Sequence, residues 1–494
     1  MISQKLGYST VLVDRVSHPR FAVGESSTPF SNLLLESISN EFHLPQLAGF
    51  IDWGHWQAAH PNIACGLKRG FSFFHHERNL PFIPDLRHAN ELLVAASPRN
   101  SLADTHWFRS EFDGHLAGEA ATLGVKFFDR TNLTRLEGLD SDGIVTLAAQ
   151  RGEDRFTLRT RYVIDATGPR GALFSALNLD EASLNPMCPT QTLFTHFRGV
   201  LRWDELFSGN SSEVPPYPID DAAVHHVFDG GWIWVLRFNN GIVSAGISAR
   251  EEFAREFGLH EGAAGWDRVL QLFPSIQTLF KRSSAIEPFR FQPRSSFRSA
   301  RVEGRNWSLL PAAAGFVDPL LSTGFALNLL GILRLARALE THGLRTRAFD
   351  DEISSIGRIA IREFEAVSHL VGALFRSMDR FDRFRSLSML YFAAASFSES
   401  AWRLGRESAA SSFLLCDQEP FASQLKEICR QVDDPRFCLS EAVSQAIAPF
   451  NVAGLCNATR NHWYPVNAGD LISSHAKLGV SRLAVEDLLA KFDC

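Results

Sequence analysis

A recurring order of helix, glycine and short apolar strand most constrains the fold of this chain. A glycine precedes the run Ser9 to Asp14 (STVLVD), and another stops a predicted helix over residues 104 to 123 before the predicted strand Val125 to Asp129. Arg161 to Gly168 (RYVIDATG) is a further apolar strand, and it runs straight into a turn of small residues. Helices that alternate with buried strands are typical of an α/β fold with a parallel sheet.

Asp14 stands where a dinucleotide-binding βαβ unit places the acid that binds a ribose hydroxyl. In such a unit this acid lies about 20 residues after a glycine loop that binds the pyrophosphate. Counting back from Asp14 by that interval passes Met1, so the first strand and the glycine loop are absent from the sequence as given. Two interpretations stay open: a nucleotide-binding acid, or a surface acid at a strand end.

Residues 223 to 249 change to an antiparallel pattern. The turn signals Asp229-Gly230-Gly231 and Asn239-Asn240-Gly241 separate three alternating strands and predict a meander. Trp232 and Trp234 share one face of the middle strand. That face forms either a tryptophan-lined wall or an ordinary sheet core, because aromatic residues are good strand formers.

A second anion-binding signal lies at the start of a long apolar helix that ends near Gly343. The segment Asn306 to Gly324 comprises a strand, an Ala/Gly turn and an Asp-Pro stop. The backbone N–H groups of Thr323 and Gly324 have no partner within a helix and suit an anion. The alternative is that Ser322 or Thr323 simply caps the helix.

Composition limits the classes of partner. The chain of 494 residues carries a net charge of −6 and no long basic block, which argues against nucleic acid and anionic lipid and favours a small-molecule partner. Phe 40 against Tyr 5 and Trp 10 predicts a dry aromatic interior. The apolar stretch from Phe325 to Leu333 is too short to span a bilayer, and no signal peptide precedes it.

No metal site or disulfide framework is predicted. The 7 cysteines are odd in number, scattered and never in a CxxC pair, which indicates a reducing, cytoplasmic location. His75 and His76 are adjacent and face opposite sides of a strand, so they cannot ligate one ion together.

Taken in order, the motifs resemble those of the flavin-dependent halogenases. The resemblance covers the chain to about residue 345 and is closest to the phenolic, phloroglucinol halogenase-like branch of this tryptophan and phenol halogenase family. The motifs are His18–Ser26 (HPRFAVGES), Gly66–Phe73 (GLKRGFSF), Arg109 with Phe112-Asp113, Asp165–Gly168 (DATG), Gly231–Trp234 (GWIW) and Gly315–Pro319 (GFVDP).

The resemblance implies a reaction and its participants. Reduced FAD from a separate, transiently bound flavin reductase reacts with oxygen and with chloride or bromide to give hypohalous acid. The acid passes through a tunnel to a lysine, which forms a chloramine or donates a hydrogen bond, and a phenolic ring is halogenated. Lys68 matches that catalytic lysine; Gly66 and Gly70 flank it, and Phe71 and Phe73 follow it. The alternative for Lys68 is a solvated lysine at a strand end.

The same resemblance assigns the other site residues. The residues implied at the cofactor are Asp14, Gly24, Glu25, Ser26, Arg109, Gly315, Phe316, Asp318 and Pro319. Those implied at the halide are Thr323 and Gly324, and those implied in the substrate pocket are Phe71, Phe73, Trp232 and Trp234.

Two further departures from the family pattern accompany the missing glycine loop. Pro311-Ala312 stands where family members carry a Gly-Asp pair whose acid contacts the flavin side chain, and Leu236-Arg237 replaces Ile-Pro at the end of the tryptophan strand. Leu321 stands where tryptophan-specific members place a glutamate, which favours an activated phenol as the substrate.

The expected fold class is α/β: an FAD-binding Rossmann-like (glutathione-reductase-like) parallel sheet, an antiparallel substrate-domain sheet and a helical C-terminal lobe predicted to be scaffold. The predicted segments are a truncated FAD-binding βαβ portion (1–60), a substrate-pocket insertion (61–100), an FAD-binding continuation (101–180), the antiparallel sheet (181–300), an FAD- and halide-binding strand-turn-helix (301–345) and the lobe (346–494).

The predicted function is that of an FAD-dependent halogenase of secondary metabolism. Two alternatives stay open. One is a flavin-dependent monooxygenase or a geranylgeranyl-reductase-like FAD oxidoreductase. The other is a truncated, non-catalytic remnant that binds apolar ligands.

Overall fold

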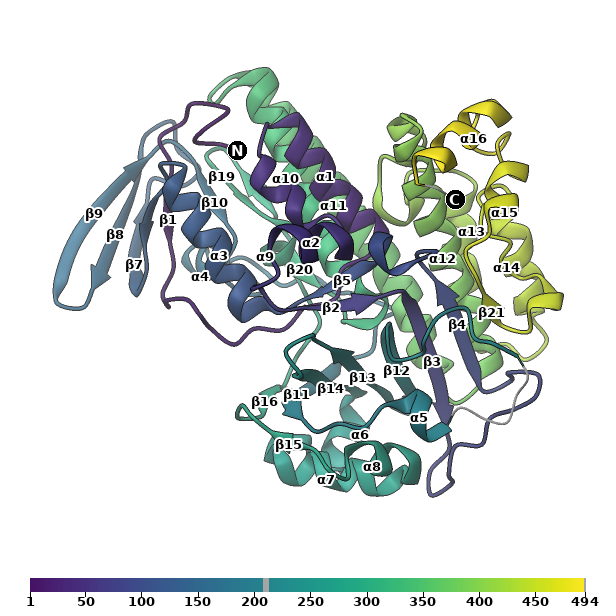
Figure 1. Ribbon diagram of the computed structural model, residues 1–494. Coiled ribbons are helices and arrows are strands. Elements are labelled where there is room, and N and C mark those ends of the chain that lie inside the picture. Colours follow the sequence, from purple (N-terminus) through teal and green to yellow (C-terminus); the bar gives the residue numbers. More distant parts are fainter. Residues whose placement is uncertain (208–212, 493–494) are drawn as a thin grey trace.

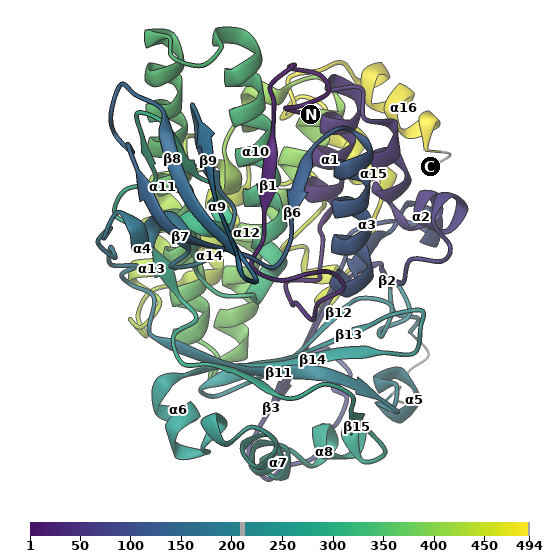
Figure 2. The same ribbon diagram turned by 90° about the vertical axis from the view of Figure 1, so that its left-hand side faces the viewer.

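The structure is a computed structural model that describes residues 1–207 and 213–492. Its largest element is a mixed sheet, seen in the lower part of Figures 1 and 2. The order of its strands is β15 (Ser284–Ala285), β11 (Thr190–Arg198), β14 (Val243–Arg250), β13 (Gly231–Arg237), β12 (Ala223–Phe228), β3 (Gly70–His76), β4 (Glu91–Ala95) and β21 (Trp463–Tyr464), and β16 (Arg290–Gln292) also pairs with β11.

The predicted meander is confirmed as β12, β13 and β14, which are antiparallel neighbours. Both faces of the sheet are covered. One face packs Ile233 and Val235 against α6 (Glu251–Glu256), α7 (Ala263–Leu272) and α8 (Pro274–Phe280). The other face places Trp232, Trp234 and Leu236 in the main core. The alternation that the sequence predicts therefore divides two cores.

Short parallel pairs join strands that are far apart in the sequence. β1 (Val11–Val13) pairs with β6 (Lys126–Phe128), and β10 (Val163–Asp165) pairs with β19 (Trp307–Leu309), which also pairs with β18 (Glu303–Gly304). An antiparallel sheet of β7 (Thr131–Glu137), β8 (Val145–Arg151) and β9 (Asp154–Thr160) projects at one end of the molecule (Figure 1). The predicted strands at Ser9–Asp14, Val125–Asp129 and Arg161–Gly168 are thus confirmed as β1, β6 and β10.

Two further pairs of strands lie close to the motifs. β2 (Cys65–Lys68) pairs with β5 (Asp104–Trp107), and β17 (Phe297–Arg298) pairs with β20 (Gly315–Phe316). The predicted helix over residues 104–123 is wrong at its start, because Asp104–Trp107 is strand β5 and helix α3 begins at Arg109 and ends at Thr122. The sequence DTHW carries a β-branched and an aromatic residue, which favour an extended strand over a helix.

The long helices of the chain pack against one another. They are α1 (Pro29–Glu41), α10 (Thr323–His342), α11 (Arg347–Arg376) and α12 (Phe381–Arg403). The shorter helices are α2 (Trp53–Ala59), α4 (Ala172–Ala176), α5 (Trp203–Phe207), α9 (Pro311–Ala314), α13 (Phe421–Arg430), α14 (Leu439–Ile447), α15 (Ala468–Ser473) and α16 (Arg482–Lys491). Figure 1 shows α13 to α16 packed beside α12.

The C-terminal lobe differs from the all-helical prediction in one respect. Its strand β21 joins the edge of the large sheet in parallel with β4, with Trp463 opposite Leu93. Within the described residues one segment, Leu320–His342, is long and apolar enough to cross a membrane, and 56% of its most apolar window is buried inside the protein. It contacts α1 and α11 and so forms part of the core.

Candidate functional site

Lys68 is fully buried, with 0% of its surface exposed. It ends β2 directly opposite Asp104 of β5. Its Nζ donates a hydrogen bond to the carbonyl oxygen of Ser27 and lies 4.0 Å from the centroid of the Phe71 ring. The alternative of a solvated lysine at a strand end is therefore wrong, because the amine is enclosed between a backbone carbonyl and an aromatic face.

Burial controls the charge at this position. It lowers the pKa of Lys68 to about 7, against the opposing influence of the Asp104 carboxylate. Burial also lowers the pKa of His106 and His225 to about 3, so both rings are neutral near pH 7. Near neutral pH, Lys68 can therefore exist both as an ammonium that donates hydrogen bonds and as a neutral, nucleophilic amine.

Glycines allow the strand of Lys68 to lie close to its neighbours. A Cβ on Gly66 would lie 2.0 Å from the carbonyl oxygen of Arg237, and one on Gly70 would lie 2.2 Å from that of Val94. Neither position has room for a side chain. The glycines that flank Lys68 in the sequence therefore serve close backbone approach.

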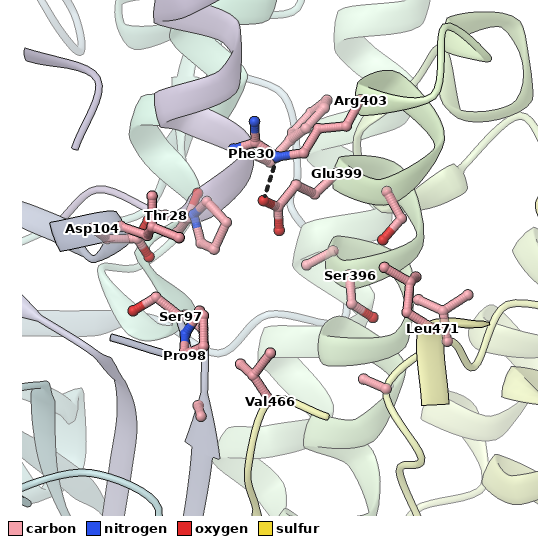
Figure 3. Close-up of a pocket in the computed structure, with 18 of the residues that line it drawn as sticks. Thr28, Phe30, Ser97, Pro98, Asp104, Ser396, Glu399, Arg403, Val466 and Leu471 are labelled. Carbon is pink, nitrogen blue, oxygen red and sulfur yellow. Dashed lines mark hydrogen bonds and ion pairs between the residues drawn. The ribbon is translucent and has the colours of Figure 1, made fainter. Parts of the chain in front are cut away.

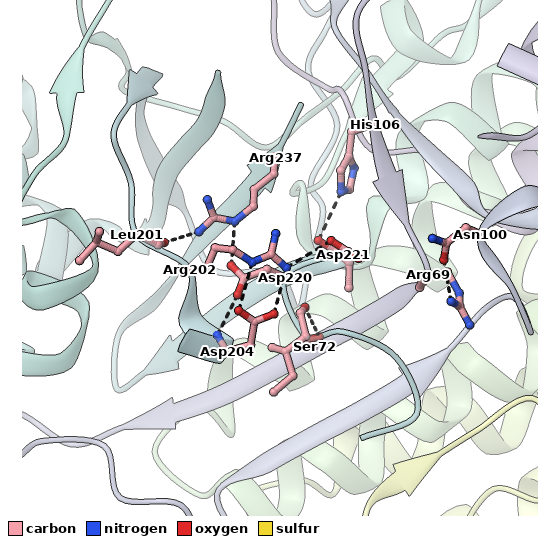
Figure 4. Close-up of polar contacts among 12 residues, drawn as sticks. Arg69, Ser72, Asn100, His106, Leu201, Arg202, Asp204, Asp220, Asp221 and Arg237 are labelled. Carbon is pink, nitrogen blue, oxygen red and sulfur yellow. Dashed lines mark hydrogen bonds and ion pairs between the residues drawn. The ribbon is translucent and has the colours of Figure 1, made fainter. Parts of the chain in front are cut away.

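A network of arginines and carboxylates holds the segment beside β2 (Figure 4). Arg237 donates to the buried Asp220 at 2.7 Å and to the carbonyl oxygen of Leu201. Arg202 bridges Asp204 and Asp221 at 2.9 and 3.3 Å. The backbone N–H of the residue after Lys68 donates to the carbonyl oxygen of Asp221 at 2.6 Å. Arg237, which departs from the family pattern, thus anchors the loop that supports the lysine strand.

The Gly24–Ser26 segment lies along β5, next to Lys68. Its residue Glu25 is hydrogen-bonded through its carbonyl oxygen to the Trp107 N–H at 2.6 Å, and its carboxylate lies 3.0 Å from Nε2 of His196. Within the described chain, Oε2 of Glu25 and the hydroxyl of Ser26 are buried without a hydrogen-bond partner. Such groups are costly unless a ligand or a water satisfies them.

Arg109 and Asp14, the other two residues implied at the cofactor in this half of the chain, are each held in place by local contacts. Arg109, at the start of α3, forms hydrogen bonds at 2.6 and 2.8 Å to Asp113 and reaches the carbonyl oxygen of Gly24 at 3.2 Å. Asp14 follows β1, and its Oδ1 accepts a hydrogen bond from the Val16 N–H at 3.0 Å.

The start of α10 has no side-chain cap. Ser322, the residue before the helix, makes no side-chain capping hydrogen bond, so the capping alternative does not hold for it. Thr323 is buried, while Gly324 is exposed and a Cβ on it would meet nothing within 4 Å. The next residue, Phe325, places its ring 4.2 Å from that of Trp107 on β5.

Asp318 ties the turn before α10 to the tryptophan strand. Its Oδ1 accepts from the Trp232 indole at 3.2 Å, and its Oδ2 accepts from the Ser248 hydroxyl at 2.6 Å. Burial raises the pKa of Asp318 to about 6, and these hydrogen bonds oppose the rise. Gly315 and Phe316 form β20, which ends two residues before this carboxylate, and Pro319 follows it.

A cavity of about 770 Å³ is lined by two neighbours of Lys68, Phe71 and Asp104, and by residues of α12 and the C-terminal elements (Figure 3). Thr28, Phe71 and Asp104 belong to one wall. Figure 3 shows Glu399 and Arg403 of α12, which are joined by a hydrogen bond of 2.9 Å, on the other side of the cavity from Thr28 and Asp104. Residues of the C-terminal elements complete the lining, and they include Tyr464, Val466, Leu471, Leu489 and Phe492.

The cavity changes the interpretation of two predicted groups. The C-terminal lobe, predicted to be scaffold, supplies one wall of this cavity. Of the four predicted pocket aromatics Phe71 lines it, whereas Phe73, Trp232 and Trp234 are buried in the core. Phe73 and Trp232 pack around His225, with ring centroids 4.4 and 5.2 Å from its ring.

Asp104 and the α12 residues were not singled out by the sequence. The strand pattern of DTHW next to a predicted helix was the signal available for Asp104. Glu399 and Arg403 belong to no motif in the sequence. Their position relative to β5 depends on packing between segments some 300 residues apart in the chain. Within the described residues no group of His, Cys, Asp or Glu could hold a metal ion.

Comparisons with known proteins identify similar chains. The chain is 30% identical over 333 residues to the tetracycline 7-halogenase of Kitasatospora aureofaciens, and the aligned residues cover 66% of this chain and 58% of that protein. It is 29% identical over 356 residues to the monodechloroaminopyrrolnitrin halogenase PrnC of Pseudomonas fluorescens, which covers 68% of this chain and 58% of that protein. The chain thus spans less than two thirds of the length of these relatives.

The fold also matches solved structures. The halogenase PltM, crystallised with phloroglucinol and FAD, superposes with a TM-score of 0.81 over 93% of this chain and 95% of its own at 22% identity. No family model matches the chain. At this identity the structural match confirms the predicted fold class, including the combination of small parallel sheets, a large sheet and a helical C-terminal region.

Proposed function

The chain belongs to the family of flavin-dependent halogenases, and from this premise we propose that it is a two-component FAD-dependent halogenase that acts on a phenolic ring. The observation that carries the proposal is the position of Lys68. A buried amine of lowered pKa is bonded to the Ser27 carbonyl oxygen, directly after the Gly24–Ser26 segment, and two of its neighbours, Phe71 and Asp104, line a large cavity.

The residues present suit part of an FAD molecule. Among the described residues, Glu25 and Ser26 each present one buried polar atom without a hydrogen-bond partner. Gly24 has a φ of +84°, a conformation that favours glycine, so no side chain covers the backbone beside Arg109. Asp14, at the carboxyl end of β1, suits a ribose hydroxyl. Gly315, Phe316, Asp318 and Pro319 would bound the cofactor at the turn before α10. The sequence as given carries no Gly-x-Gly-x-x-Gly loop, so no residue is assigned to the pyrophosphate.

FAD bound in reduced form supplies, with oxygen and chloride or bromide, the hypohalous acid that the reaction consumes. The chain's own part begins at the halide. Thr323 and Gly324 offer N–H groups at an uncapped helix start, which suits a halide ion. A flavin reductase would supply the reduced cofactor.

Lys68 would then position the oxidant against the ring. As an ammonium it donates a hydrogen bond to hypohalous acid, and as an amine it forms a chloramine; its lowered pKa permits both. Phe71 contacts Lys68 and also lines the cavity, so this ring connects the amine to the space where an aromatic substrate would bind. The cavity volume is within the range of small-molecule sites.

The test of this function is a reconstituted reaction. The protein is supplied with FAD, a flavin reductase, NADH, oxygen and either bromide or chloride, and phloroglucinol products are identified by mass spectrometry. We expect halogenated phloroglucinol only when halide is present. Product that forms independently of halide indicates a monooxygenase. Rapid consumption of NADH without a reductase indicates a reductase-like enzyme. A colourless protein that binds no flavin indicates a non-catalytic remnant.

Gly324→Ala separates the halide site from the stability of the helix. We expect the variant to fold with equal or greater stability, by up to about 1 kcal/mol, because a Cβ meets nothing within 4 Å and alanine favours a helix. The added methyl group covers the N–H approach, so we expect the KM for bromide to rise about tenfold through a weakened hydrogen bond to the ion. The KM for phloroglucinol serves as the internal control. An unchanged KM for bromide would remove Gly324 from the halide site.

A further inference from the structure

Asp104 lines the cavity and has one carboxylate oxygen without a hydrogen-bond partner among the described residues. The residue is 3% exposed, its Oδ1 accepts a hydrogen bond from the Asn32 side chain at 3.2 Å, and it belongs to the cavity wall. Its Oδ2 is buried and has no hydrogen-bond partner within the described residues. The amine of Lys68 donates to the carbonyl oxygen of Ser27 instead of to this oxygen.

A buried carboxylate oxygen without a partner is costly unless a ligand supplies a donor. The cavity beside Asp104 is the place from which such a donor can come, and Phe71 on the same wall suits an aromatic ring. Burial also raises the pKa of Asp104, with Lys68 opposing the rise, so the ionised carboxylate is a stronger base toward a phenolic proton than an exposed aspartate.

The register between the strands relates this oxygen to the amine. Lys68 and Asp104 are direct partners on antiparallel strands, so their side chains leave the same face with Cβ atoms about 5 Å apart. When the donor group of an aromatic substrate is held at Asp104, the two ring carbons next to the carbon that carries this group lie closest to Lys68. More distant ring carbons lie deeper in the cavity.

We propose that Asp104 binds the aromatic hydroxyl of the substrate through its Oδ2 and so directs halogenation to the carbon adjacent to that hydroxyl. This inference rests on the proposed function and names the substrate class of the same site: a ring with a free hydroxyl group. Asp104 contacts the reacting molecule and is a catalytic residue in this sense.

The step balances with hypohalous acid as the oxidant. A pair of ring electrons forms the carbon–halogen bond while the oxygen–halogen bond breaks, so the ring is oxidised by two electrons and the halogen is reduced. The departing hydroxide takes a proton from the Lys68 ammonium to form water, and the phenolic proton passes to Asp104. The ring carbon then loses its proton to the Lys68 amine, and Asp104 returns its proton to the oxygen, which restores the phenol.

Two substrates that differ by one methyl group test the inference. The substrates are 3-methoxyphenol, which has a free hydroxyl, and 1,3-dimethoxybenzene, which has none. We expect the wild-type protein to brominate 3-methoxyphenol at the carbons adjacent to its hydroxyl. For Asp104→Asn we expect kcat/KM on 3-methoxyphenol to fall at least about tenfold, the loss of a hydrogen bond to a charged group, with more product at the carbon opposite the hydroxyl. The rate on 1,3-dimethoxybenzene should stay within about twofold.

Glu36→Gln is the matched control. Glu36 also lines the cavity, and its contact with Arg403 is long, at 3.6 Å. We expect this variant to retain the wild-type ratio of the two substrates. If Asp104→Asn lowers both rates equally, Asp104 acts through Lys68 alone and the inference is overturned. Circular dichroism and the melting temperature establish that each variant folds.

A binding measurement separates failure of this inference from failure of the proposed function. Calorimetry with 3-methoxyphenol needs no flavin, and we expect Asp104→Asn and Asp104→Ala to weaken binding at least about tenfold relative to the wild type. Equal affinities overturn the role of Asp104 whether or not product forms. If the wild-type protein brominates neither ring while the affinities differ, the proposed function fails and the hydroxyl-binding site stands.

Discussion

Lys68→Met is expected to lower the rate of phenol halogenation by about a thousandfold, the range that a positioned proton donor or acceptor contributes. The Lys68 amine is buried against Phe71 and the Ser27 carbonyl oxygen. Methionine fills a similar volume and removes both the hydrogen-bond donor and the nucleophile. The rate is measured as halogenated phloroglucinol formed with reduced FAD, oxygen and bromide, and flavin binding is followed by its absorbance.

The control for this variant is Lys281→Met, which replaces an exposed lysine just after α8. We expect it to leave turnover, flavin binding and the melting temperature unchanged, since exposed single substitutions have small effects. Turnover by Lys68→Met at the wild-type rate, with the variant folded, would contradict the assignment of Lys68. A loss of flavin binding along with activity would place the effect at the cofactor.

Gly66→Ala is expected to destabilise the protein by about 3 kcal/mol or more, the upper part of the range for overpacked positions. The new Cβ would lie 2.0 Å from the carbonyl oxygen of Arg237 and 2.9 Å from the His106 side chain. The first of these atoms is backbone, held in place by the pairing of β13 with β14, so it cannot move aside cheaply. Urea unfolding measures the change in free energy of unfolding.

Gly118→Ala, within α3, is the matched control for this substitution. A Cβ there meets nothing within 4 Å, and alanine is favoured over glycine in a helix by about 1 kcal/mol. We therefore expect this variant to be as stable as the wild type or more stable. If Gly66→Ala unfolds at the same urea concentration as the wild type, β2 does not depend on close approach to β13, and the account of how Lys68 is positioned is wrong.

The local pattern of apolar and turn residues was sufficient to predict most of the strands near the motifs. The alternation around Trp232 and the flanking turns predicted β12 to β14, and the short apolar runs predicted β1, β6 and β10. These signals are short-range, because side-chain period and turn chemistry act over a few residues. The same approach misplaced Asp104–Trp107 in a helix, since a four-residue strand next to a helix has no period of its own to reveal it.

Local residue order indicated the family and the fold class and singled out Lys68 as a candidate, because each of these depends on the identity and order of neighbouring residues. Only packing between distant segments places Asp104 opposite that lysine and brings α12 and the C-terminal elements to the cavity that Asp104 also lines. Strand register and the packing of distant helices depend on contacts between residues far apart in the chain, such as Phe30 and Trp402, whose ring centroids are 5.4 Å apart. Local periodicity carries no record of such pairs.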